Sequence, residues 1–393
     1  MKILHINGTC QGGAANFTIN LHQNLLNKNF ESSIFLPNDI NNLTNIYYPE
    51  SHIYKLLSKI KIIIVKILNK YFFKIKSTVT LGIFSSYFIK KLIKKLNPEI
   101  VHLHWLGNET MSLKDISGFK IPVVVTMHDM WFISPVEHYC VEYENDLKNS
   151  KLKNYFLNTL LNQKKKVSKK INYICTSEWM RSQGIKSGIL RDSFIRKIGC
   201  GIDFEKWKSI DKIDAKKKLN LDVNKKYILF SSMGLSQRKG FDLFVEAVKG
   251  LNQNIQILIS SDEAPKDKLE FKYHFFKNLN NTASRSLLYS AADMCILPSR
   301  QEAFGLVCLE AAACNTPSVI FSDTGLTEII THKKNGFIAK KNSHKEIVKG
   351  IEWILKKLNE DENYFQNVRE TVKQFDIKKI TEEYIKLYND ILK

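Results

Sequence analysis

Ser299-Arg-Gln-Glu-Ala-Phe-Gly-Leu-Val-Cys-Leu-Glu310 is the stretch that decides how the second half of this sequence folds. It follows an apolar run, residues 294–297, which is typical of a buried strand. Residues 306–314 have the periodicity of a helix, and the consecutive alanines 311–313 strengthen that prediction. Gly305 falls at the predicted start of this helix, where free backbone amides suit a phosphate. The stretch therefore predicts a strand, a loop and a helix that together form an anion site.

Two carboxylates flank this predicted helix start. Glu302 and Glu310 are eight positions apart, which is roughly 12 Å of rise if the whole segment were helical. One carboxylate is then expected at the mouth of the site and the other about two turns further in. From the spacing alone, two ordinary surface glutamates are an equally good interpretation.

This Glu-x7-Glu spacing after a buried strand, with Ala303-Phe304-Gly305 between, resembles the retaining glycosyltransferases of family 4. The resemblance implies that Glu302 contacts hydroxyls of the donor sugar and that Glu310 holds the ribose of the nucleotide. It also implies that the diphosphate meets the backbone of Phe304, Gly305 and Leu306.

Length and composition favour a two-domain globular protein. The chain has 393 residues and is 44% apolar, and no run of about 18 apolar residues predicts a membrane span. The first residues enter a strand directly without a leader-like segment, so we expect a cytoplasmic protein. Its seven cysteines are scattered and form no Cys-x-x-Cys pair, which indicates reduced and mostly packed thiols.

The net charge of +20 is unevenly distributed. Residues 51–98 contain no acidic residue but eleven lysines, interleaved with aliphatic and aromatic side chains at near-helical spacing. Residues 51–95 should be helical with a break near residues 77–82. A second acid-free run, residues 147–177, adds the lysines 164–166, 169 and 170. This pattern suits an anionic membrane surface and predicts a peripheral protein on the inner face of the cell membrane. Solvated lysine from an AT-rich genome is the alternative; no nucleic-acid motif accompanies the charge, so no nucleic-acid partner is expected.

The amino-terminal motif is a strand followed by a glycine turn and a helix. Residues 2–7 precede Gly8-Thr-Cys-Gln-Gly-Gly-Ala-Ala-Asn16, in which Gly12 and Gly13 would let backbone amides approach a phosphate. A merely tight connection explains such a turn equally well. The Gly-Gly-Ala-Ala start resembles the family 4 branch that builds bacterial exopolysaccharides, and this implies that Gly12 and Gly13 bind the donor.

Histidines lie at or near the ends of two predicted strands, residues 100–105 and 121–126. Buried strands alternating with helices predict a parallel sheet, whose ligands lie beyond the carboxyl ends of the strands. His102-Leu-His-Trp105 and Thr126-Met-His-Asp-Met-Trp131 again resemble the exopolysaccharide branch. The resemblance places His128 beside the transferred sugar, where a neutral imidazole could hydrogen-bond the sugar or steady the departing phosphate. A satisfied core histidine is the alternative.

Adjacent cations, Arg238 and Lys239, follow the predicted strand 227–232 and precede Gly240 and a helix. A forked guanidinium, an ammonium and helix amides make a clamp for a diphosphate, although a solvated pair is possible. No Asp-x-Asp pair occurs to hold a divalent metal on such a diphosphate. We therefore expect no metal and no cofactor beyond the nucleoside diphosphate sugar as co-substrate.

Taken together, the motifs and the resemblance predict two Rossmann-like, doubly wound α/β domains facing each other across a cleft, the GT-B arrangement. Residues 1–198 would bind the acceptor, residues 199–374 the nucleotide sugar, and residues 375–393 would form a helix that crosses back to the first domain. The resemblance implies a retaining hexosyltransferase acting on an acceptor hydroxyl, with a lipid-linked saccharide of bacterial surface polysaccharide synthesis as the expected acceptor. A sugar-nucleotide epimerase and a non-catalytic module that binds nucleotide sugar or membrane are the alternatives.

Overall fold

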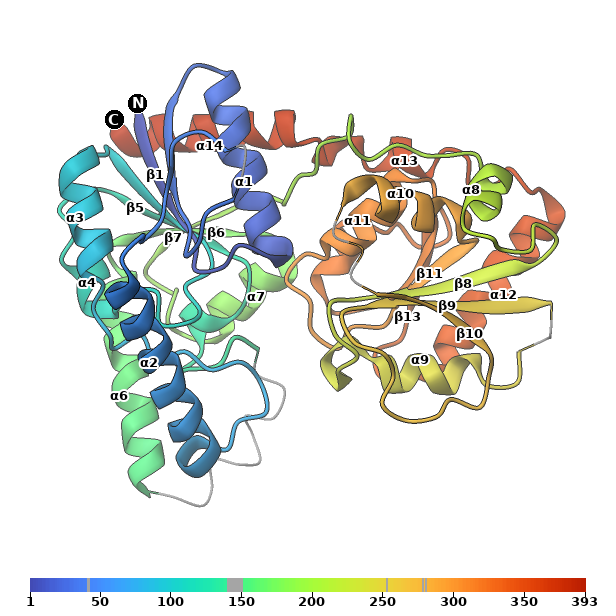
Figure 1. Cartoon of the computed structure of the whole chain (residues 1–393), viewed down its shortest axis with the longest axis horizontal. Helices are drawn as coiled ribbons and strands as arrows, with labels where there is room; N and C mark the ends of the chain where they lie inside the picture. The colour runs from blue at the N-terminus through green and yellow to red at the C-terminus, as the bar shows by residue number, and fades with distance from the viewer. Residues whose placement is uncertain (41–42, 140–150, 252–253, 278, 280) are drawn as a thin grey trace. The chain divides into compact units, whose positions relative to one another are not determined.

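The computed structural model describes residues 1–40, 43–139, 151–251, 254–277, 279 and 281–393 (Figure 1). Cys140 and part of the second acid-free run, residues 147–150, lie outside the described residues. The chain forms two compact units. The first comprises Met1–Gly199 together with Ile380–Lys393, and the second comprises Cys200–Lys379. The boundary expected after residue 198 lies one residue before the end of the first segment.

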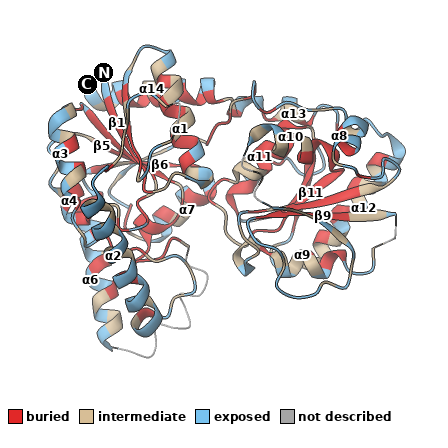
Figure 2. Cartoon of the chain, viewed as in Figure 1, coloured by how far each residue is buried: buried red, intermediate tan, exposed pale blue. Residues whose placement is uncertain are grey.

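The first unit contains a parallel seven-stranded sheet in the order β3-β2-β1-β4-β5-β6-β7. Its central strands are buried along their whole length, which explains their continuous apolar sequences (Figure 2). The strand order reverses between β1 and β4, and such a reversal is where α/β sheets bind ligands. The strands are β1 (Lys2–Ile6), β2 (Glu31–Phe35), β3 (Ile46–Tyr47), β4 (Ile100–Leu103), β5 (Val123–Met127), β6 (Ile171–Cys175) and β7 (Phe194–Lys197).

The second unit contains a six-stranded sheet in the order β10-β9-β8-β11-β12-β13, again with every pair parallel. Here the order reverses between β8 and β11, the two strands that precede the predicted cation and glutamate motifs. The strands are β8 (Lys226–Ser231), β9 (Ile255–Ser261), β10 (Tyr273–Lys277), β11 (Met294–Leu297), β12 (Ser318–Phe321) and β13 (Gly336–Ala339).

Helices connect most of the successive parallel strands in both units; β2 leads to β3, and β9 to β10, without one. None of the helices in the described part of the chain is both long and apolar enough to cross a bilayer. The first unit has α1 (Gly12–Asn27), α2 (His52–Leu68), α3 (Tyr87–Leu96), α4 (Leu113–Ser117), α6 (Lys151–Ser168) and α7 (Glu178–Lys186). The second unit has α8 (Lys212–Lys218), α9 (Phe241–Val248), α10 (Thr282–Ala291), α11 (Leu306–Ala313), α12 (His344–Glu360) and α13 (Val368–Thr371), and α14 (Ile377–Leu392) follows it.

Helix α14 belongs mainly to the first unit although it follows the second in sequence. Two of its tyrosines are fully buried there. The Tyr388 hydroxyl lies 2.7 Å from His102 Nδ1 on β4, and the Tyr384 hydroxyl lies 2.8 Å from Thr126 Oγ1 on β5. These hydrogen bonds fix the returning helix against the carboxyl-end half of the first sheet.

The basic region forms a separate layer in which α2 packs beside α6 (Figure 1). Helix α2 continues as one π turn, Asn69–Phe73, and the non-helical break before α3 is wider than the sequence predicts, because residues 74–86 run across the layer without helix. A small apolar cluster joins the two helices; its buried members are Val65, Phe73, Leu81, Val136, Leu157 and Leu160.

One lysine of the predicted basic surface is buried instead. Lys164 is 2% exposed, and its ammonium donates to the backbone carbonyls of Trp131 and Ser134. It also lies 3.9 Å from the centre of the Trp131 ring. Including Lys164 in a membrane-facing charge patch is therefore wrong: this residue holds α6 to the segment after β5.

Candidate functional site

In the second unit, the loops that follow β8 and β11 contact each other because the two strands are paired. The Arg300 N–H donates to the Arg238 carbonyl at 2.7 Å, and Arg238 Nη1 donates to the Gln301 carbonyl at 3.0 Å. The predicted cation motif and the predicted Glu302 motif, far apart in sequence, are thus joined by hydrogen bonds. They meet where the strand order of the sheet reverses.

Lys239 and Glu302 form the central ion pair of this site. The Lys239 ammonium lies 2.5 Å from Glu302 Oε2, and the Ser299 hydroxyl donates to the same oxygen at 3.2 Å. Burial raises the pKa of Glu302, but the charges of Lys239 and Arg238 outweigh it and the pKa lies below its usual value. Burial lowers the pKa of Lys239, and the nearby Glu302 offsets only part of that. Glu302 is therefore an ionised carboxylate at neutral pH, with its counter-ion already in place.

Two glycines allow the backbone of this site to come together. Gly240 has φ +72°, and a Cβ there would lie 2.0 Å from the Pro298 carbonyl oxygen. Gly305 has φ +99°, and a Cβ there would lie 2.2 Å from a methyl group of Leu326. Both positions require glycine, because an L side chain is strained at these angles and would overlap a neighbour. Gly305 is the residue before α11, as the sequence predicts.

The side chains that flank Gly305 are structural. Phe304 is buried, and its ring packs edge-on against Phe375 with centroids 5.3 Å apart. Leu306 is the first residue of α11. The backbone amides at the start of α11 are the groups of this segment that suit a phosphate.

Glu310 lies on α11 and is held by two residues of α10. Its Oε2 accepts hydrogen bonds from the Arg285 guanidinium and, at 3.3 Å, from the Tyr289 hydroxyl. Burial raises the pKa of Glu310, and Arg285 offsets part of that rise. The guanidinium also stacks 5.0 Å above the Trp207 ring. Sequence reasoning missed Arg285, because the only signal in the chain is an arginine on a predicted helix with nothing to indicate its partner.

In the first unit, Gly12 and Gly13 begin α1 directly after the turn that follows β1. Gly12 has φ +88°, so the turn uses glycine's freedom at that position. The turn also contacts the segment after β4: the Gly8 N–H donates to the Trp105 carbonyl at 2.6 Å, and the Trp105 N–H donates to Asn7 Oδ1 at 3.0 Å. The two predicted strand-end motifs of this unit therefore meet where its strand order reverses.

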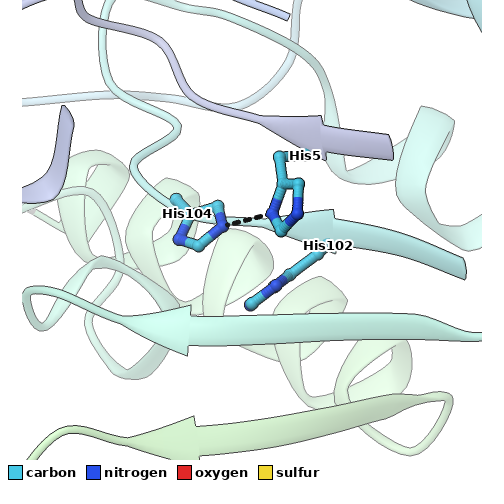
Figure 3. Close-up of side chains that lie close together, drawn as sticks. All are labelled: His5, His102 and His104. Atoms are coloured by element: carbon cyan, nitrogen blue, oxygen red, sulfur yellow. Dashed lines mark hydrogen bonds between the residues drawn. The ribbon is translucent and has the colours of Figure 1, made fainter. Parts of the chain in front are cut away.

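Histidines occupy the same end of the first sheet (Figure 3). His128 follows β5, and its Nε2 lies 3.1 Å from His104 Nδ1; His104 Nε2 lies 3.1 Å from His5 Nδ1. Burial lowers the pKa of all three, that of His128 to about 4 although Asp129 opposes the shift. Each imidazole is therefore neutral at neutral pH, which suits hydrogen bonding to a sugar or phosphate oxygen.

His5, His102 and His104 have ring nitrogens within 4.8 Å of one another, close enough to raise the question of a metal ion. Within the described residues, however, hydrogen bonds engage both nitrogens of His102, through Tyr388 and Thr126, and both nitrogens of His104. Of the ring nitrogens of these three histidines, only His5 Nε2 has no hydrogen-bond partner within the described residues. In this arrangement the nitrogens of His102 and His104 are thus engaged by separate hydrogen-bond partners.

The structure assembles the predicted residues in two groups, one in each unit. His128, Gly12 and Gly13 lie in the first unit, and Arg238, Lys239, Glu302, Phe304, Gly305, Leu306 and Glu310 lie in the second. Within the second unit, Lys239 and Glu302 contact each other directly. Glu310 instead contacts α10, so the two glutamates have different partners.

This pair of parallel-sheet α/β units, each with polar groups at the reversal of its strand order, is the fold of the GT-B glycosyltransferases. Residues 11–206 match the family model described as Glycosyltransferase Family 4, and residues 211–371 match that of Glycosyl transferases group 1. Outside the two matches lie only residues 1–10, 207–210 and 372–393. The chain belongs to glycosyltransferase family 4, and its resemblance to that family, expected from the sequence, is confirmed.

Curated relatives carry the same family relation at low identity. The chain is 25% identical over 323 residues to N,N'-diacetylbacillosaminyl-diphospho-undecaprenol alpha-1,3-N-acetylgalactosaminyltransferase of Campylobacter jejuni, covering 78% of this chain and 81% of that protein. It is 23% identical to the capsular polysaccharide biosynthesis glycosyltransferase CapM of Staphylococcus aureus, covering 56% of this chain and 62% of that protein. An uncharacterised glycosyltransferase of Methanocaldococcus jannaschii is 28% identical over 190 residues, which are 45% of this chain. The matched segment spans about half (48%) of that relative's length.

Solved structures share the fold over nearly the whole chain. Sucrose-phosphate synthase from Thermosynechococcus elongatus superposes with a TM-score of 0.74 at 18% identity, covering 99% of this chain and 98% of that one. HepE from Anabaena, solved in complex with UDP and glucose, superposes with a TM-score of 0.70 at 17% identity, covering 99% and 100%. These identities establish the fold and not the substrate.

Proposed function

We propose that this glycosyltransferase moves a sugar from a nucleoside diphosphate sugar to an acceptor hydroxyl, with retention of the anomeric configuration. The observation that carries the proposal is the contact between the Arg238–Lys239 turn and the Glu302 loop at the strand-order reversal of the second unit. Two cations, a carboxylate and the start of α11 gathered at one place suit a sugar diphosphate.

The proposed chemistry needs little beyond positioning and charge. The bond between the anomeric carbon and the diphosphate oxygen breaks, and a bond from the acceptor oxygen to the anomeric carbon forms on the same face. The acceptor proton passes to the departing phosphate. Arg238, Lys239 and the amides at Gly305 stabilise the negative charge that grows on the diphosphate, so the proposal needs no divalent metal. Glu302 orients the sugar, Glu310 holds the ribose, and Gly12 and Gly13 approach the donor by their backbone.

His128 is proposed to contact the sugar or the departing phosphate from the first unit. Its imidazole is neutral at neutral pH because burial lowers its pKa to about 4. A neutral ring is suited to donate a hydrogen bond to a substrate oxygen, whereas it is a weak proton acceptor at that pKa.

Titration of the protein with UDP, GDP, ADP and CMP, in EDTA, tests the donor site. We expect one nucleoside diphosphate to bind, and Glu310→Gln to weaken that binding at least tenfold because a carboxylate pairs more strongly with ribose hydroxyls than an amide does. Gln is chosen because it keeps a hydrogen-bond acceptor for the half-buried Arg285, which Ala would remove. Glu352→Gln, at an exposed position of α12, is the control and should bind normally. Failure of every nucleotide to bind would contradict the proposal.

We further propose that the acceptor is a lipid-linked saccharide of bacterial surface polysaccharide synthesis, reached at an anionic membrane surface. The name of the Campylobacter relative contains a diphospho-undecaprenol, and that of the Staphylococcus relative refers to capsular polysaccharide. Neither name assigns the acceptor of this chain, but both support a lipid-linked saccharide as the first acceptor to test.

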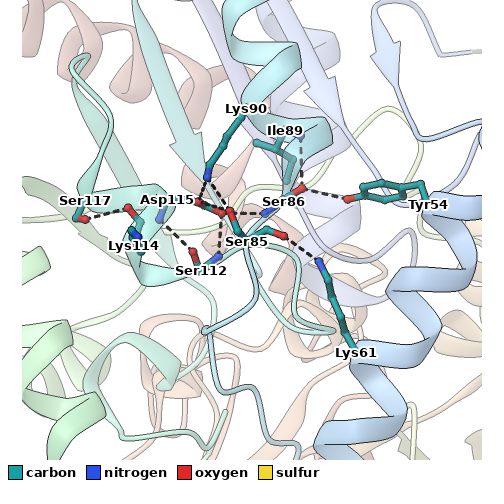
Figure 4. Close-up of polar contacts among 10 residues, drawn as sticks. All are labelled: Tyr54, Lys61, Ser85, Ser86, Ile89, Lys90, Ser112, Lys114, Asp115 and Ser117. Atoms are coloured by element: carbon teal, nitrogen blue, oxygen red, sulfur yellow. Dashed lines mark hydrogen bonds and ion pairs between the residues drawn. The ribbon is translucent and has the colours of Figure 1, made fainter.

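Helix α2 supplies the surface for that proposal. Its inward side is fixed to neighbouring segments: the Tyr54 hydroxyl lies 3.1 Å from Ser86 Oγ, and the Lys61 ammonium donates to the Ser85 carbonyl at 2.9 Å (Figure 4). Ser85 in turn donates to Asp115 Oδ1 at 2.6 Å on α4. These bonds determine which face of α2 points outward.

The outward face of α2 is apolar, which is unusual for a surface helix. The exposed aliphatic side chains follow i, i+3, i+4, i+7 spacing and are Ile53, Leu56, Leu57, Ile60, Ile63, Ile64, Ile67 and Leu68, each at least 37% exposed. Lys59, Lys66 and Lys70 are also exposed on the same helical segment. Apolar side chains with adjacent lysines match the requirements of an interface rich in anionic lipid, where the apolar groups insert and the cations meet headgroups.

Sedimentation with vesicles tests this surface. We expect pelleting with phosphatidylserine-containing vesicles and little pelleting with pure phosphatidylcholine. Lys59→Gln/Lys66→Gln/Lys70→Gln should lose the anionic preference, and Ile60→Ser/Ile64→Ser/Ile67→Ser should lose pelleting altogether. Lys61 is left unchanged because it bonds to Ser85. Ile213→Ser, an exposed isoleucine of the second unit, is the control. Pelleting of all variants equal to that of the wild type would contradict the proposal.

A further inference from the structure

Three imidazoles form one hydrogen-bonded row that runs from the core of the first unit to the strand end. His5 is fully buried in β1, His104 is 2% exposed, and His128 is half-buried. Each neighbouring pair is joined through ring nitrogens 3.1 Å apart, Nδ1 of His5 to Nε2 of His104, and Nδ1 of His104 to Nε2 of His128 (Figure 3 shows the first of these). The row thus ends at the residue proposed to contact substrate.

Neutral rings in such a row can be arranged in only two ways. A neutral imidazole has one N–H donor and one bare nitrogen acceptor, and every hydrogen bond needs one of each. If His104 donates through Nδ1, it must accept from His5, and His128 then carries its proton on Nδ1. If His104 donates through Nε2, His128 must donate to it and carries its proton on Nε2. The proton positions of the three rings are therefore coupled.

The buried end of the row distinguishes the two arrangements. His5 Nε2 has no hydrogen-bond partner within the described residues. In the first arrangement this atom is a bare acceptor, and in the second it is an unpaired buried N–H. Unpaired donors are rarer in protein interiors than unpaired acceptors. The first arrangement is favoured for this reason, and it puts the proton of His128 on Nδ1.

We propose that His104, held in turn by His5, is a positioning residue that fixes His128 as its Nδ1–H tautomer, so that His128 presents a hydrogen-bond donor to a substrate oxygen. His128 makes its own ring hydrogen bond through Nε2, and no hydrogen bond within the described residues uses its Nδ1. The atom class that fits this donor is a sugar hydroxyl or a phosphate oxygen. The inference rests on the proposed function for the identity of that substrate, but not for the tautomer.

Long-range ¹H–¹⁵N correlation spectra of protein labelled with ¹⁵N-histidine read the tautomer directly, with His128→Gln used to assign the signals. We expect a protonated Nδ1 and a bare Nε2 on His128 of the wild type. In His104→Phe the partner of Nε2 is lost, so both nitrogens should move toward averaged shifts. His22→Gln, a buried histidine bonded to Ser32 and Thr44 outside the row, should leave the His128 signals unchanged. A proton on Nε2 in the wild type, or an unaltered His128 in His104→Phe, would overturn the inference.

Kinetics supply the second measurement. We expect His104→Phe to lower kcat about tenfold, as loss of a supporting hydrogen bond typically does, while nucleotide affinity in the titration stays the same. An active His104→Phe enzyme with unchanged kcat would overturn the inference even if the protein were otherwise normal. Because the spectra need no turnover, a protein with the expected tautomer but no transferase activity would contradict the proposed function and leave the assignment of the tautomer intact. If His104→Phe does not fold, the wild-type spectrum alone still decides the tautomer.

Discussion

The two units place their candidate residues at the same kind of position. The residues of the second unit are charged, whereas those of the first unit are neutral. In the second unit, Lys239 pairs with Glu302 and Arg285 pairs with Glu310, so the groups are charged and each has a counter-ion. In the first unit, imidazoles with lowered pKa values make neutral hydrogen bonds to one another, as His128 does. Both sets lie where the strand order reverses.

This difference between ion pairs and neutral imidazoles shows how polar groups remain stable in each site although water is largely excluded. A buried charge is tolerated when a partner compensates for its lost hydration, whereas an imidazole can simply stay neutral. Removing one residue from the second site therefore leaves an uncompensated charge. Removing one residue from the first site leaves only an unmade hydrogen bond, which costs less. Charge suits a group that meets diphosphate, and neutrality suits a group that meets a sugar hydroxyl or a leaving oxygen.

The largest expected effect comes from breaking the charged pair. Lys239→Met should lower kcat by about 10²–10³ because the developing charge on the diphosphate loses a preorganised cation. It should also reduce the free energy of unfolding by roughly 3 kcal/mol, since Glu302 is left unpaired. The double variant Lys239→Met/Glu302→Gln should recover most of the stability and none of the activity. Lys217→Met, at an exposed position of α8, is the control for both measurements.

Moving the cations without changing any charge should have the next largest effect. Gly240→Ala places a methyl group against the Pro298 carbonyl at φ +72°, so the turn carrying Arg238 and Lys239 must shift away from β11. We expect a loss of roughly 2–3 kcal/mol in the free energy of unfolding, measured with urea, and weaker nucleotide binding. Gly234→Ala is a close control, because a Cβ there would have no atom within 4 Å. Equal stability of the two variants would show that charge alone positions the cations.

Mild acid should affect the stability of the first unit more than that of the second, and each buried histidine should contribute less than either substitution above. Burial lowers the folded-state pKa of His5, His102 and His104 well below 6.5 and that of His128 to about 4. As pH falls from 7 to 5 the unfolded chain binds protons that the folded chain does not, so the free energy of unfolding falls, by about 1–2 kcal/mol for a histidine of pKa near 4. The lowered pKa of Glu302 acts only in stronger acid, below about 4.5.

Hydrogen exchange measures this difference in acid sensitivity between the two units. Between pH 7 and 5, peptides from β1 and β4 should lose protection, corrected for intrinsic rates, while peptides from β8 and β11 change little. His104→Phe should show a shallower decrease than the wild type, because one of the buried histidines no longer titrates. His344→Gln, on the helix α12 of the second unit, should behave as the wild type does. Equal loss of protection in both units would contradict the electrostatic difference between them.

The sequence was most informative where a buried strand ends in a polar motif. The strands β11 and β5 are central and buried on both faces, so their sequences, residues 294–297 and 121–126, are nearly continuous apolar runs. Once such a strand is recognised, the position of the polar loop after it is also known. The edge strands β7 and β10 were missed for the complementary reason: both are half-exposed, so neither has an apolar run to detect.

Pairings between distant residues were the other part that the sequence did not indicate. Nothing near Arg285 predicts that it meets Glu310, because the contact depends on how α10 packs against α11. Lys164 was predicted to face outward from a cluster of lysines, but its place on the inner side of α6 buries it against Trp131. Composition predicts the charge of a region correctly and cannot predict which single member of it points inward.

The sequence position of α14 has a consequence for how the protein is made. Residues Ile380–Lys393 complete the first unit, yet the ribosome synthesises them after all of the second. Until then, Thr126 and His102 lack Tyr384 and Tyr388, their partners on α14. The second unit is one uninterrupted segment, whereas the amino-terminal unit is completed only by residues that are synthesised after the second unit. For this chain the usual order of synthesis, in which the amino-terminal domain is completed first, is reversed.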